Sequence, residues 1–429
     1  MRVLVIGGYG LIGGEAVRLL GARGAEVVGA GRDLHGARRR FPDIEWRQAE
    51  LGRTDEAGWA AVLQGIEVVV NAAGALQDGL REDLRAVHVE GLRTLVAACR
   101  SAGVRRLVHL SAAGVAPGRG GGFNDSKAEG EAIVAAGGLD WVILRPGLVF
   151  GPGAFGGTAM LRGLAGFPGM IPAFSPQATI QPVALQVVAQ SIARAVQPDA
   201  PHGVTLDLVG ADRLPLAEVL RRLRGWLGFA PAPLLALPTP IVRLAGRVAD
   251  GLGWLGWRNP MRTNAIEQIA LGMDTPPGGE AALGLKPQAF AEILQALPST
   301  LQERRFARLY FAKPALLIAL AAFCAFTGVV SLTSYAASTG LLTRAGLRSP
   351  LTDALVVGGA VLDLLAALAI CVRRFTSRGL IALIGLSAGY LAIASVLRPD
   401  LWLEPLGALP KTLMLMLMAG VALGMMDER

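Results

Sequence analysis

Charged residues are scarce in this sequence of 429 residues: 17% are Asp, Glu, Lys or Arg, whereas 52% are apolar. The mean hydropathy is +0.48. Ordinary soluble domains contain roughly 45–50% apolar and roughly 25% charged residues. The chain is therefore too apolar to be wholly water-soluble, and we expect part of it to lie in lipid. The same composition excludes a disordered or fibrous protein.

Cysteine is also rare, and Cys99, Cys324 and Cys371 stand apart without a CxxC motif or a Cys/His cluster. This spacing predicts neither a disulfide framework nor a metal site, and it fits a reducing compartment. The net charge of +8 comes from scattered arginines. No basic helix is interleaved with aromatic residues, so we expect no nucleic-acid partner. A membrane protein with positive cytoplasmic loops carries such a surplus in any case.

Short apolar runs alternate with helix-like stretches over residues 1–150; the runs are RVLVIG, AEVVGAG, EVVVNAAG, RRLVHLS and WVILRPG. That alternation predicts an α/β fold, a doubly wound parallel-sheet Rossmann domain. From 151 to 300 the rhythm is looser, which predicts a small mixed α/β second domain that holds or covers a substrate. The first residues lack the charged and long apolar regions of a signal peptide, so we expect the N-terminus to stay inside.

The composition changes beyond Lys313, and residues 301–429 contain four stretches almost free of charge: 314–332, 354–372, 379–397 and 407–426. A membrane-spanning helix needs about 20 apolar residues, so these stretches predict a C-terminal four-helix transmembrane bundle.

Basic residues near the spans predict the orientation of the bundle. They gather before the first span and between the second and third, and they are fewer in the other two loops. We expect an integral protein of the inner or plasma membrane, with both termini and the N-terminal domain in the cytoplasm. The first set is Arg304, Arg305, Arg308, Lys313, Arg373, Arg374 and Arg378, and the second is Arg344, Arg348, Arg398 and Lys411.

A glycine-rich turn follows the first predicted strand and opens a helix. It reads Gly7-Gly8-Tyr9-Gly10-Leu11-Ile12-Gly13. Glycines there permit a tight turn and close approach of a pyrophosphate, and the helix N-terminus favours negative charge. Its place in a βαβ rhythm predicts nucleotide binding.

Arg32 stands at the end of the second predicted strand, where an NAD site usually has an acidic residue on the ribose hydroxyls. An arginine there pairs instead with a 2′-phosphate. NADP(H) is therefore favoured over NAD(H), although Asp33 keeps NAD open. Residues 38–40, all arginine, also suit a solvated helix face.

Over about residues 1–297 the motifs resemble the extended and atypical short-chain dehydrogenases/reductases, with most similarity to the nucleotide-binding accessory subunit of respiratory complex I and its bacterial relatives. The resemblance rests on the glycine turn and on the segments Glu50-Leu51, Asn71-Ala72-Ala73-Gly74 and Leu144 to Pro152. It implies that the cofactor is held by the glycine turn (Gly7, Tyr9, Gly10, Leu11, Ile12, Gly13), Arg32, Glu50, Leu51, Ala72, Ala73, Gly74, Lys127 and Pro146.

The family also implies a catalytic Ser, Tyr and Lys, with the last two spaced YxxxK. The matching positions here are Ser111, Phe123 and Lys127. A phenyl ring transfers no proton, and loss of a general acid typically costs ~10²–10⁴ in rate. His88 is a second departure, because the family commonly has asparagine there.

Two functions remain open. In the first, the protein is a membrane-anchored oxidoreductase acting on a quinone, isoprenoid or lipid at the cytoplasmic leaflet, with its proton from His88, His109, Asp125 or water. In the second, the domain binds NADP(H) without turnover and serves as a sensor or as a structural subunit beside a membrane-protein partner. Phe123 favours the second, and enzyme activity stays undecided.

The four spans resemble the DoxX-like family of four-helix membrane proteins, which suggests that a membrane lipid or another lipophilic molecule is bound. Within the second span Asp363 is a costly intramembrane carboxylate that calls for a partner, and Lys411 is a candidate. Residues 240–258 form an amphipathic segment with two tryptophans. It suits either a membrane interface or an ordinary core face.

Overall fold

The computed structural model describes residues 1–75, 83–119, 121–257, 260–405 and 407–426. The chain divides into two compact units. The first comprises Met1–Asp250 and Asn259–Ala307, and the second comprises Gly251–Arg258 and Arg308–Arg429.

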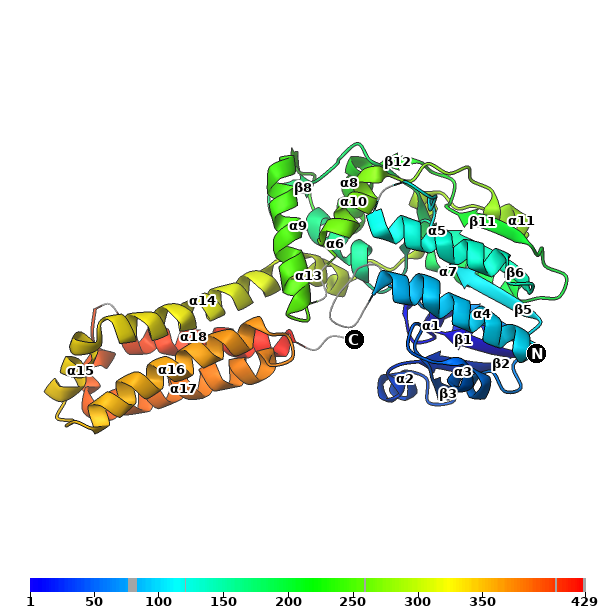
Figure 1. Ribbon diagram of the computed structural model, residues 1–429. Coiled ribbons are helices and arrows are strands. Elements are labelled where there is room, and N and C mark those ends of the chain that lie inside the picture. The colour runs from blue at the N-terminus through cyan, green and yellow to red at the C-terminus, as the bar shows by residue number, and fades with distance from the viewer. Residues whose placement is uncertain (76–82, 120, 258–259, 406, 427–429) are drawn as a thin grey trace. The chain divides into compact units, whose positions relative to one another are not determined.

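A parallel sheet of seven strands forms the middle of the first unit (Figure 1). The strand order is β11-β6-β5-β4-β1-β2-β3, and every neighbouring pair is parallel. The order reverses between β1 and β4, and ligands of such sheets bind outside the carboxyl ends of the strands at that point. The strands are β1 (Arg2–Ile6), β2 (Glu26–Gly31), β3 (Glu45–Gln48), β4 (Val68–Asn71), β5 (Arg106–Leu110), β6 (Asp140–Pro146) and β11 (Val204–Leu208).

Helices cover both faces of the sheet because successive strand side chains point to opposite faces. In β1, Val3 and Val5 enter the apolar core shared with α1 and α7. Leu4 and Ile6 enter the core shared with α3, α4 and α5. The predicted doubly wound Rossmann domain is confirmed. Its helices are α1 (Leu11–Ala22), α2 (Leu34–Arg40), α3 (Glu56–Val62), η1 (Ala86–Glu90), α4 (Gly91–Ser101), α5 (Gly121–Ala135) and α7 (Leu185–Ala195).

The segment after residue 150 interleaves with this sheet, since β11 and α7 both come from it. Three two-stranded pairs, β7–β10, β8–β13 and β9–β12, add a smaller layer. The strands are β7 (Leu148–Phe150), β8 (Ile171–Ala173), β9 (Thr179–Ile180), β10 (Pro182–Ala184), β12 (Leu214–Pro215) and β13 (Leu234–Ala236). The helices are α6 (Gly156–Ala165), α8 (Leu216–Trp226), α9 (Thr239–Trp254), α10 (Thr263–Leu271), α11 (Gly279–Ala282), α12 (Phe290–Ala296) and α13 (Leu301–Leu309).

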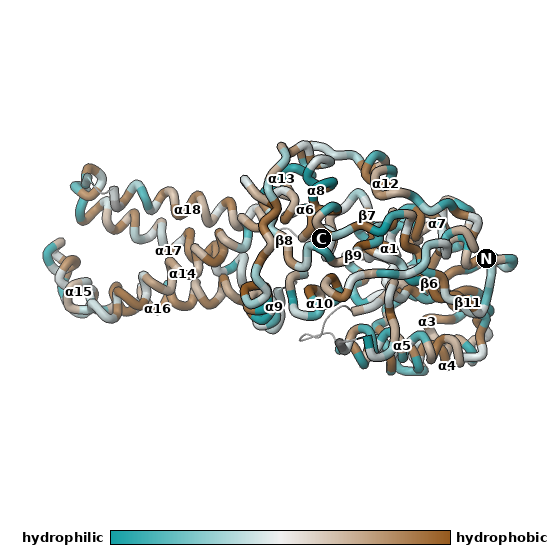
Figure 2. The backbone as a smooth tube through the Cα atoms, turned by 90° about the horizontal axis from the view of Figure 1, so that it is seen from above, coloured by the Kyte–Doolittle hydropathy of each residue, from teal (hydrophilic) through white to brown (hydrophobic). Residues whose placement is uncertain are grey.

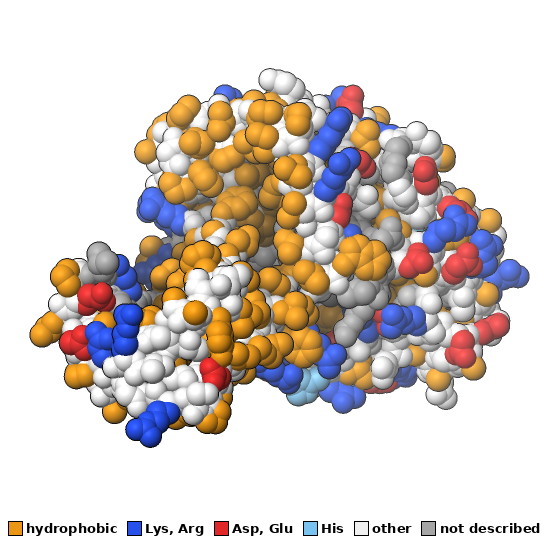
Figure 3. Space-filling view, turned by 60° about the vertical axis from the view of Figure 1, so that its left-hand side comes forward, with side chains coloured by type: hydrophobic (Ala, Val, Ile, Leu, Met, Phe, Trp, Pro, Cys, Tyr) orange, Lys and Arg blue, Asp and Glu red, His pale blue; other side chains and the backbone are white. Residues whose placement is uncertain are grey.

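Long apolar helices form the second unit, and Figure 2 shows them largely in brown and white. α14 packs on α16, α16 on α17, and α18 on both α17 and α14. In Figure 3 orange side chains run along this unit, at lower left, and charged ones gather at its end. The helices are α14 (Ala312–Thr333), α15 (Tyr335–Arg344), α16 (Leu351–Cys371), α17 (Thr376–Leu397), η2 (Pro399–Trp402) and α18 (Ala408–Gly424).

Three helical stretches of the described chain are long and apolar enough to cross a membrane. They are Leu301–Thr333, which comprises α13 and α14, Leu351–Cys371, which is α16, and Thr376–Leu397, which is α17. α18, in the predicted fourth span, has 17 residues and a length of about 26 Å, short of the roughly 20 residues that a span needs. It nevertheless contributes Ala419 and Ala422 to the core of the bundle.

Candidate functional site

The glycine turn lies between β1 and α1, at the carboxyl edge of the sheet. Gly7 has φ +74°, and a Cβ there would lie 3.0 Å from the backbone nitrogen of Ala73. At Gly13 a Cβ would lie 2.3 Å from the Gly7 carbonyl oxygen. Gly10 is the N-cap residue of α1, and it has no side chain that could accept a hydrogen bond from the first turn of the helix. The N–H groups of the first turn of α1, which Leu11 and Ile12 begin, are therefore available to an anion.

Tyr9 closes one side of this turn. Its ring lies over Gly31, where a Cβ would come 2.3 Å from the Tyr9 Cε1 atom. The Tyr9 hydroxyl accepts a hydrogen bond of 3.3 Å from the Asp33 amide. The Arg40 guanidinium donates to the Tyr9 carbonyl at 2.6 Å. The end of β2 and the glycine turn are thus held together by short-range contacts.

Two charged residues, Arg32 and Asp33, follow the end of β2, and they differ in how far their side chains are already engaged. The Asp33 carboxylate accepts the Gly36 amide at 3.0 Å and caps α2, so it is already engaged. The Arg32 side chain is 38% exposed, and its Nη1 lies 3.7 Å from the Glu50 Oε1. Glu50 lies at the same distance from Arg53. Arg32 is thus reachable from solvent at the carboxyl end of β2.

Leu51, by contrast, is buried in the core that includes α3 and α4. Its side chain belongs to the core, so a cofactor contact of the kind that the resemblance implies at this position would involve the backbone. Pro146 ends β6 and is buried, and its carbonyl accepts the Ala113 amide at 3.0 Å. Both residues shape the edge of the sheet through backbone and core contacts.

The loop after β4 carries Ala72, Ala73 and Gly74 and is fixed by a buried side chain. Asn71 Oδ1 accepts the Ala73 amide at 3.2 Å, and Asn71 Nδ2 donates to His109 Nδ1 at 3.1 Å. Complete burial lowers the pKa of His109 well below its ordinary value. His109 is therefore a neutral core residue rather than a source of protons.

His88, in the π-helical turn η1, belongs to a hydrogen-bonded chain. The Ala75 amide donates to His88 Nε2 at 3.2 Å, and His88 Nδ1 lies 3.0 Å from Ser126 Oγ. Ser126 Oγ in turn donates to the Phe123 carbonyl at 3.1 Å. The accepting Nε2 leaves the proton on Nδ1. Burial, with the nearby charge of Lys127, lowers the pKa of His88 to about 3.

Phe123 occupies the position of the family's tyrosine and is buried. It packs with Ala75 and Leu84, and its ring meets the His88 imidazole edge-on at 5.7 Å between centroids. The ring thus fills space beside the imidazole, whose own hydrogen bonds hold it in place. Asp125 is exposed and accepts the Gly118 amide at 2.9 Å.

Two polar side chains remain available for chemistry beside β5. Ser111 is buried, and its Oγ has no hydrogen-bond partner among the described residues. Lys127 is also buried and donates to the Leu110 carbonyl at 3.1 Å. Burial lowers the pKa of Lys127 to about 8, although Glu131 opposes the shift. A Cβ on Gly74 would lie 3.4 Å from Lys127 Nζ, so this amine reaches the loop after β4.

These features fit a dinucleotide. The glycine turn and α1 provide an anion site, Arg32 is partly exposed at the end of β2, and the buried Ser111 hydroxyl has no hydrogen-bond partner among the described residues. Reasoning from sequence missed Ser126 and Asn71 as the partners of the two histidines. Both pairs are separated by 38 positions, so no local pattern reveals them.

In the second unit Asp363 is buried in α16 and meets polar groups of two other helices. Its Oδ2 accepts Thr327 Oγ1 of α14 at 3.1 Å, and the hydroxyl of Tyr390 in α17 also hydrogen-bonds to it. Lys411 is exposed on α18, and no described contact joins it to Asp363. The described partners of the Asp363 carboxyl group are therefore hydroxyls, whereas Lys411 was the candidate from sequence.

Comparison with known proteins agrees with the division of the chain into a nucleotide-binding unit and a helical unit. Residues 7–166 match a family described as NAD(P)H-binding, and residues 321–420 match the DoxX-like family. The chain therefore carries an N-terminal NAD(P)-binding Rossmann domain and a C-terminal DoxX-like domain. The DoxX-like domain and the three apolar helices indicate an integral membrane protein.

Relatives include sterol demethylase protein B of Methylococcus capsulatus, 28% identical over 59% of this chain and 82% of that protein. Ceramide reductase of Caulobacter vibrioides is 26% identical over 58% of this chain and 77% of its own length. The 2-alkyl-3-oxoalkanoate reductase of Stenotrophomonas maltophilia is 31% identical over 36% of this chain and 52% of its own length.

Among solved structures, the NADPH-dependent quinone oxidoreductase QOR2 of Escherichia coli superimposes with a TM-score of 0.54 at 18% identity, over 68% of this chain and 98% of that one. The Bordetella bronchiseptica enzyme WbmG in complex with NAD gives 0.52 at 18% identity, over 72% and 95%. At such identities these neighbours show the fold alone, that of NAD(P)-binding enzymes of the short-chain dehydrogenase/reductase type.

Proposed function

We propose that this chain, in which an NAD(P)-binding Rossmann domain is joined to a DoxX-like membrane domain, is an NADPH-dependent reductase of lipophilic carbonyl or quinone substrates. The observation that carries the proposal is the pair of buried groups beside β5: Ser111 Oγ, which has no partner in the described part of the chain, and the Lys127 amine with a pKa of about 8. Buried hydroxyls almost always have a partner, so this one is suited to a substrate oxygen.

When bound, the nicotinamide supplies the hydride. The Ser111 hydroxyl donates a hydrogen bond to the substrate oxygen and orients it. Lys127 is mostly protonated at pH 7, yet its pKa lies close to neutrality, which is the condition for an efficient general acid. Lys127 thus takes the proton-donating role that Phe123 lacks.

His88 and His109 do not fill that role. Both are neutral. Both nitrogens of His88 are committed, to Ala75 and Ser126, and His109 accepts a hydrogen bond from Asn71 at Nδ1 in the fully buried core, where burial holds its pKa well below its ordinary value. This arrangement leaves Lys127 as the titratable group at the site whose pKa lies nearest to neutrality.

The preference for NADPH rests on Arg32, which is partly exposed at the end of β2, and on Asp33, whose carboxylate is engaged as a helix cap. A guanidinium pairs well with a 2′-phosphate. An NAD site would instead present a free acidic side chain to the ribose hydroxyls.

The lipophilic substrate is supported by two relatives whose names refer to a sterol and a ceramide. It is also supported by the apolar side chains that α9 leaves exposed: Ile241 and Val248 at 56% and Leu244 at 63%. Together with Arg243 and Arg247 on the same helix, they suit a helix lying at a membrane surface. Basic residues around α14 and between α16 and α17 favour a cytoplasmic nucleotide domain.

The test uses the full chain in lipid nanodiscs, with NADPH oxidation followed in the presence of long-chain aldehydes, ketones and quinones. Ser111→Ala and Lys127→Gln are expected to lower the rate at least about a hundredfold. The matched controls Ser101→Ala and Lys286→Gln alter exposed residues and should leave it unchanged. Equal rates in all four variants would refute the proposed roles.

A second candidate function is favoured by Phe123, which removes the usual proton donor: NADPH binding without turnover, as a sensor or as a subunit beside a membrane-protein partner. Its signature would be tight NADPH binding and no oxidation with any acceptor. Phe123→Tyr would then restore no activity.

A further inference from the structure

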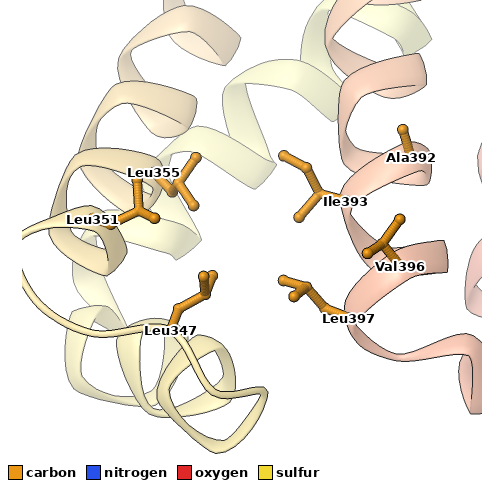
Figure 4. Close-up of a pocket in the computed structure, with 7 residues that line it drawn as sticks. All are labelled: Leu347, Leu351, Leu355, Ala392, Ile393, Val396 and Leu397. Carbon is orange, nitrogen blue, oxygen red and sulfur yellow. The ribbon is translucent and has the colours of Figure 1, made fainter.

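The two halves of the DoxX-like unit are packed differently. The end at which α14 begins has a continuous apolar core that includes Leu317, Leu320, Ile370 and Leu383. Toward the other end, α16, α17 and the loop before α16 line a hollow of about 410 Å³ that is open to the surface. Its lining is wholly apolar: Leu347, Leu351, Leu355, Ala392, Ile393, Val396 and Leu397. Leu347 and Leu355 point across it toward Leu397 and Ile393 (Figure 4).

Beyond the lining residues, the next inward turns of both helices carry a polar cluster. Tyr390 lies one turn before Ile393 on α17, and Gly359 lies one turn after Leu355 on α16. A Cβ on Gly359 would come 2.8 Å from the Tyr390 hydroxyl, so this phenol crosses to α16 at the point where the apolar lining ends. One further turn along α16 is Asp363, to which Tyr390 hydrogen-bonds.

The cluster of Asp363, Thr327 and Tyr390 can still accept hydrogen bonds, but its hydroxyl protons are already used. Thr327 and Tyr390 each have one hydroxyl proton. Tyr390 hydrogen-bonds to Asp363, and the Thr327 hydroxyl lies within donating distance of both Asp363 Oδ2, at 3.1 Å, and the Cys324 carbonyl, at 3.0 Å, so neither proton is left for a ligand. A carboxylate offers about four lone-pair positions, and the phenol oxygen can accept as well. A ligand head that donates a hydrogen bond is therefore satisfied here, whereas a carboxylate or phosphate head finds only acceptors.

Two side chains at the hollow and the cluster are exposed, so a ligand can reach the cluster from the surface of the unit. Tyr390 is 41% exposed and Ile393 is 37% exposed, whereas Asp363 is 7% exposed. In a bilayer these open side chains face lipid rather than water. The helical distance from Leu351 to Asp363 is about 18 Å, which is the reach of a long hydrocarbon chain.

We propose that the DoxX-like unit binds a single-chain, long-chain alcohol: its hydrocarbon chain lies in the hollow between α16 and α17, and its hydroxyl donates to the cluster of Asp363 and Tyr390. Apolar walls with a few convergent polar groups are the usual composition of a small-molecule site. The proposal concerns this unit alone and does not rest on the reductase activity.

The test uses the full chain in phosphatidylcholine nanodiscs and two photoactivatable, clickable probes with the same chain, hexadecan-1-ol and hexadecanoic acid. The alcohol is expected to label peptides of α16 and α17 saturably, in competition with unlabelled hexadecanol, and at least about fivefold more than the acid. Ile393→Trp fills the hollow and should reduce labelling by the alcohol to the level of the acid.

Val357→Trp is the matched control, since Val357 is an exposed residue of α16 that does not line the hollow, and labelling should persist. Asp363→Asn should weaken labelling severalfold while leaving the hollow intact. Elution profile and NADPH binding report whether each variant is folded. Equal labelling by both probes, or unchanged labelling in Ile393→Trp, would mean ordinary contact with bilayer lipid and would overturn the proposal. Unchanged labelling in Asp363→Asn would overturn the head-group assignment.

Discussion

Protonation of Lys127 is expected to control the reductase rate. Burial lowers the pKa of this amine to about 8. The protonated fraction then falls from about nine-tenths at pH 7 to about one-tenth at pH 9. If the ammonium is the general acid, kcat/KM falls about tenfold over this interval and continues to fall about tenfold per pH unit. Since kcat/KM reports the groups of the free enzyme, it is the quantity to measure.

The assay is NADPH oxidation by the full chain in nanodiscs between pH 6 and 10, with the most active lipophilic acceptor. A profile that stays flat to pH 10 would refute the role of Lys127. His88 would produce a different profile, because with a pKa of about 3 it is already neutral over the whole range. In Lys127→Gln the residual rate should lose the break near pH 8, whereas Lys286→Gln should keep it.

Three further predictions concern the nucleotide domain. Gly13→Ala should abolish nucleotide binding in calorimetry, because its Cβ would lie 2.3 Å from the Gly7 carbonyl oxygen, whereas Gly21→Ala, with open space around the new Cβ, should bind normally. Arg32→Asp should weaken NADPH binding at least about tenfold and leave NADH binding equal or stronger; equal losses for both would contradict the 2′-phosphate contact. Without nucleotide, Lys127→Met should raise the free energy of unfolding at pH 7 by up to about 3 kcal/mol, because it removes a buried charge whose pKa is lowered from 10.5 to about 8. In the native sequence that penalty is complete below pH 8 and disappears as the pH rises toward 10.5, so the gain measured by denaturant unfolding should shrink over that window.

Local patterns predicted the nucleotide-binding turn because its function depends on neighbouring residues. Gly7 is required by its positive φ and by its contact with the loop after β4, and Gly13 is required by its contact with the Gly7 carbonyl. Likewise, alternation along β1 is sufficient to predict a strand covered on both faces. Fold class and cofactor class therefore follow from short stretches of sequence.

Contacts between distant segments were not predictable in the same way. The tautomer of His88 depends on Ser126 and on the amide of Ala75, which only the folded chain brings together. The partner of Asp363 was expected to be an opposite charge, yet helix packing supplies Thr327 and Tyr390. Leu51 matched a family motif, but its side chain belongs to the core.

Nucleotide titration followed by turnover in the same sample tests the central claim most directly. Full-length protein in nanodiscs is titrated with NADPH and with NADH, and oxidation of the bound nucleotide is then followed with long-chain aldehydes, ketones and quinones. The account predicts binding of NADPH at least about tenfold tighter than NADH, and oxidation by at least one acceptor that is lost in Ser111→Ala. Failure to bind either nucleotide, or tight binding with no oxidation by any acceptor, would contradict a reductase.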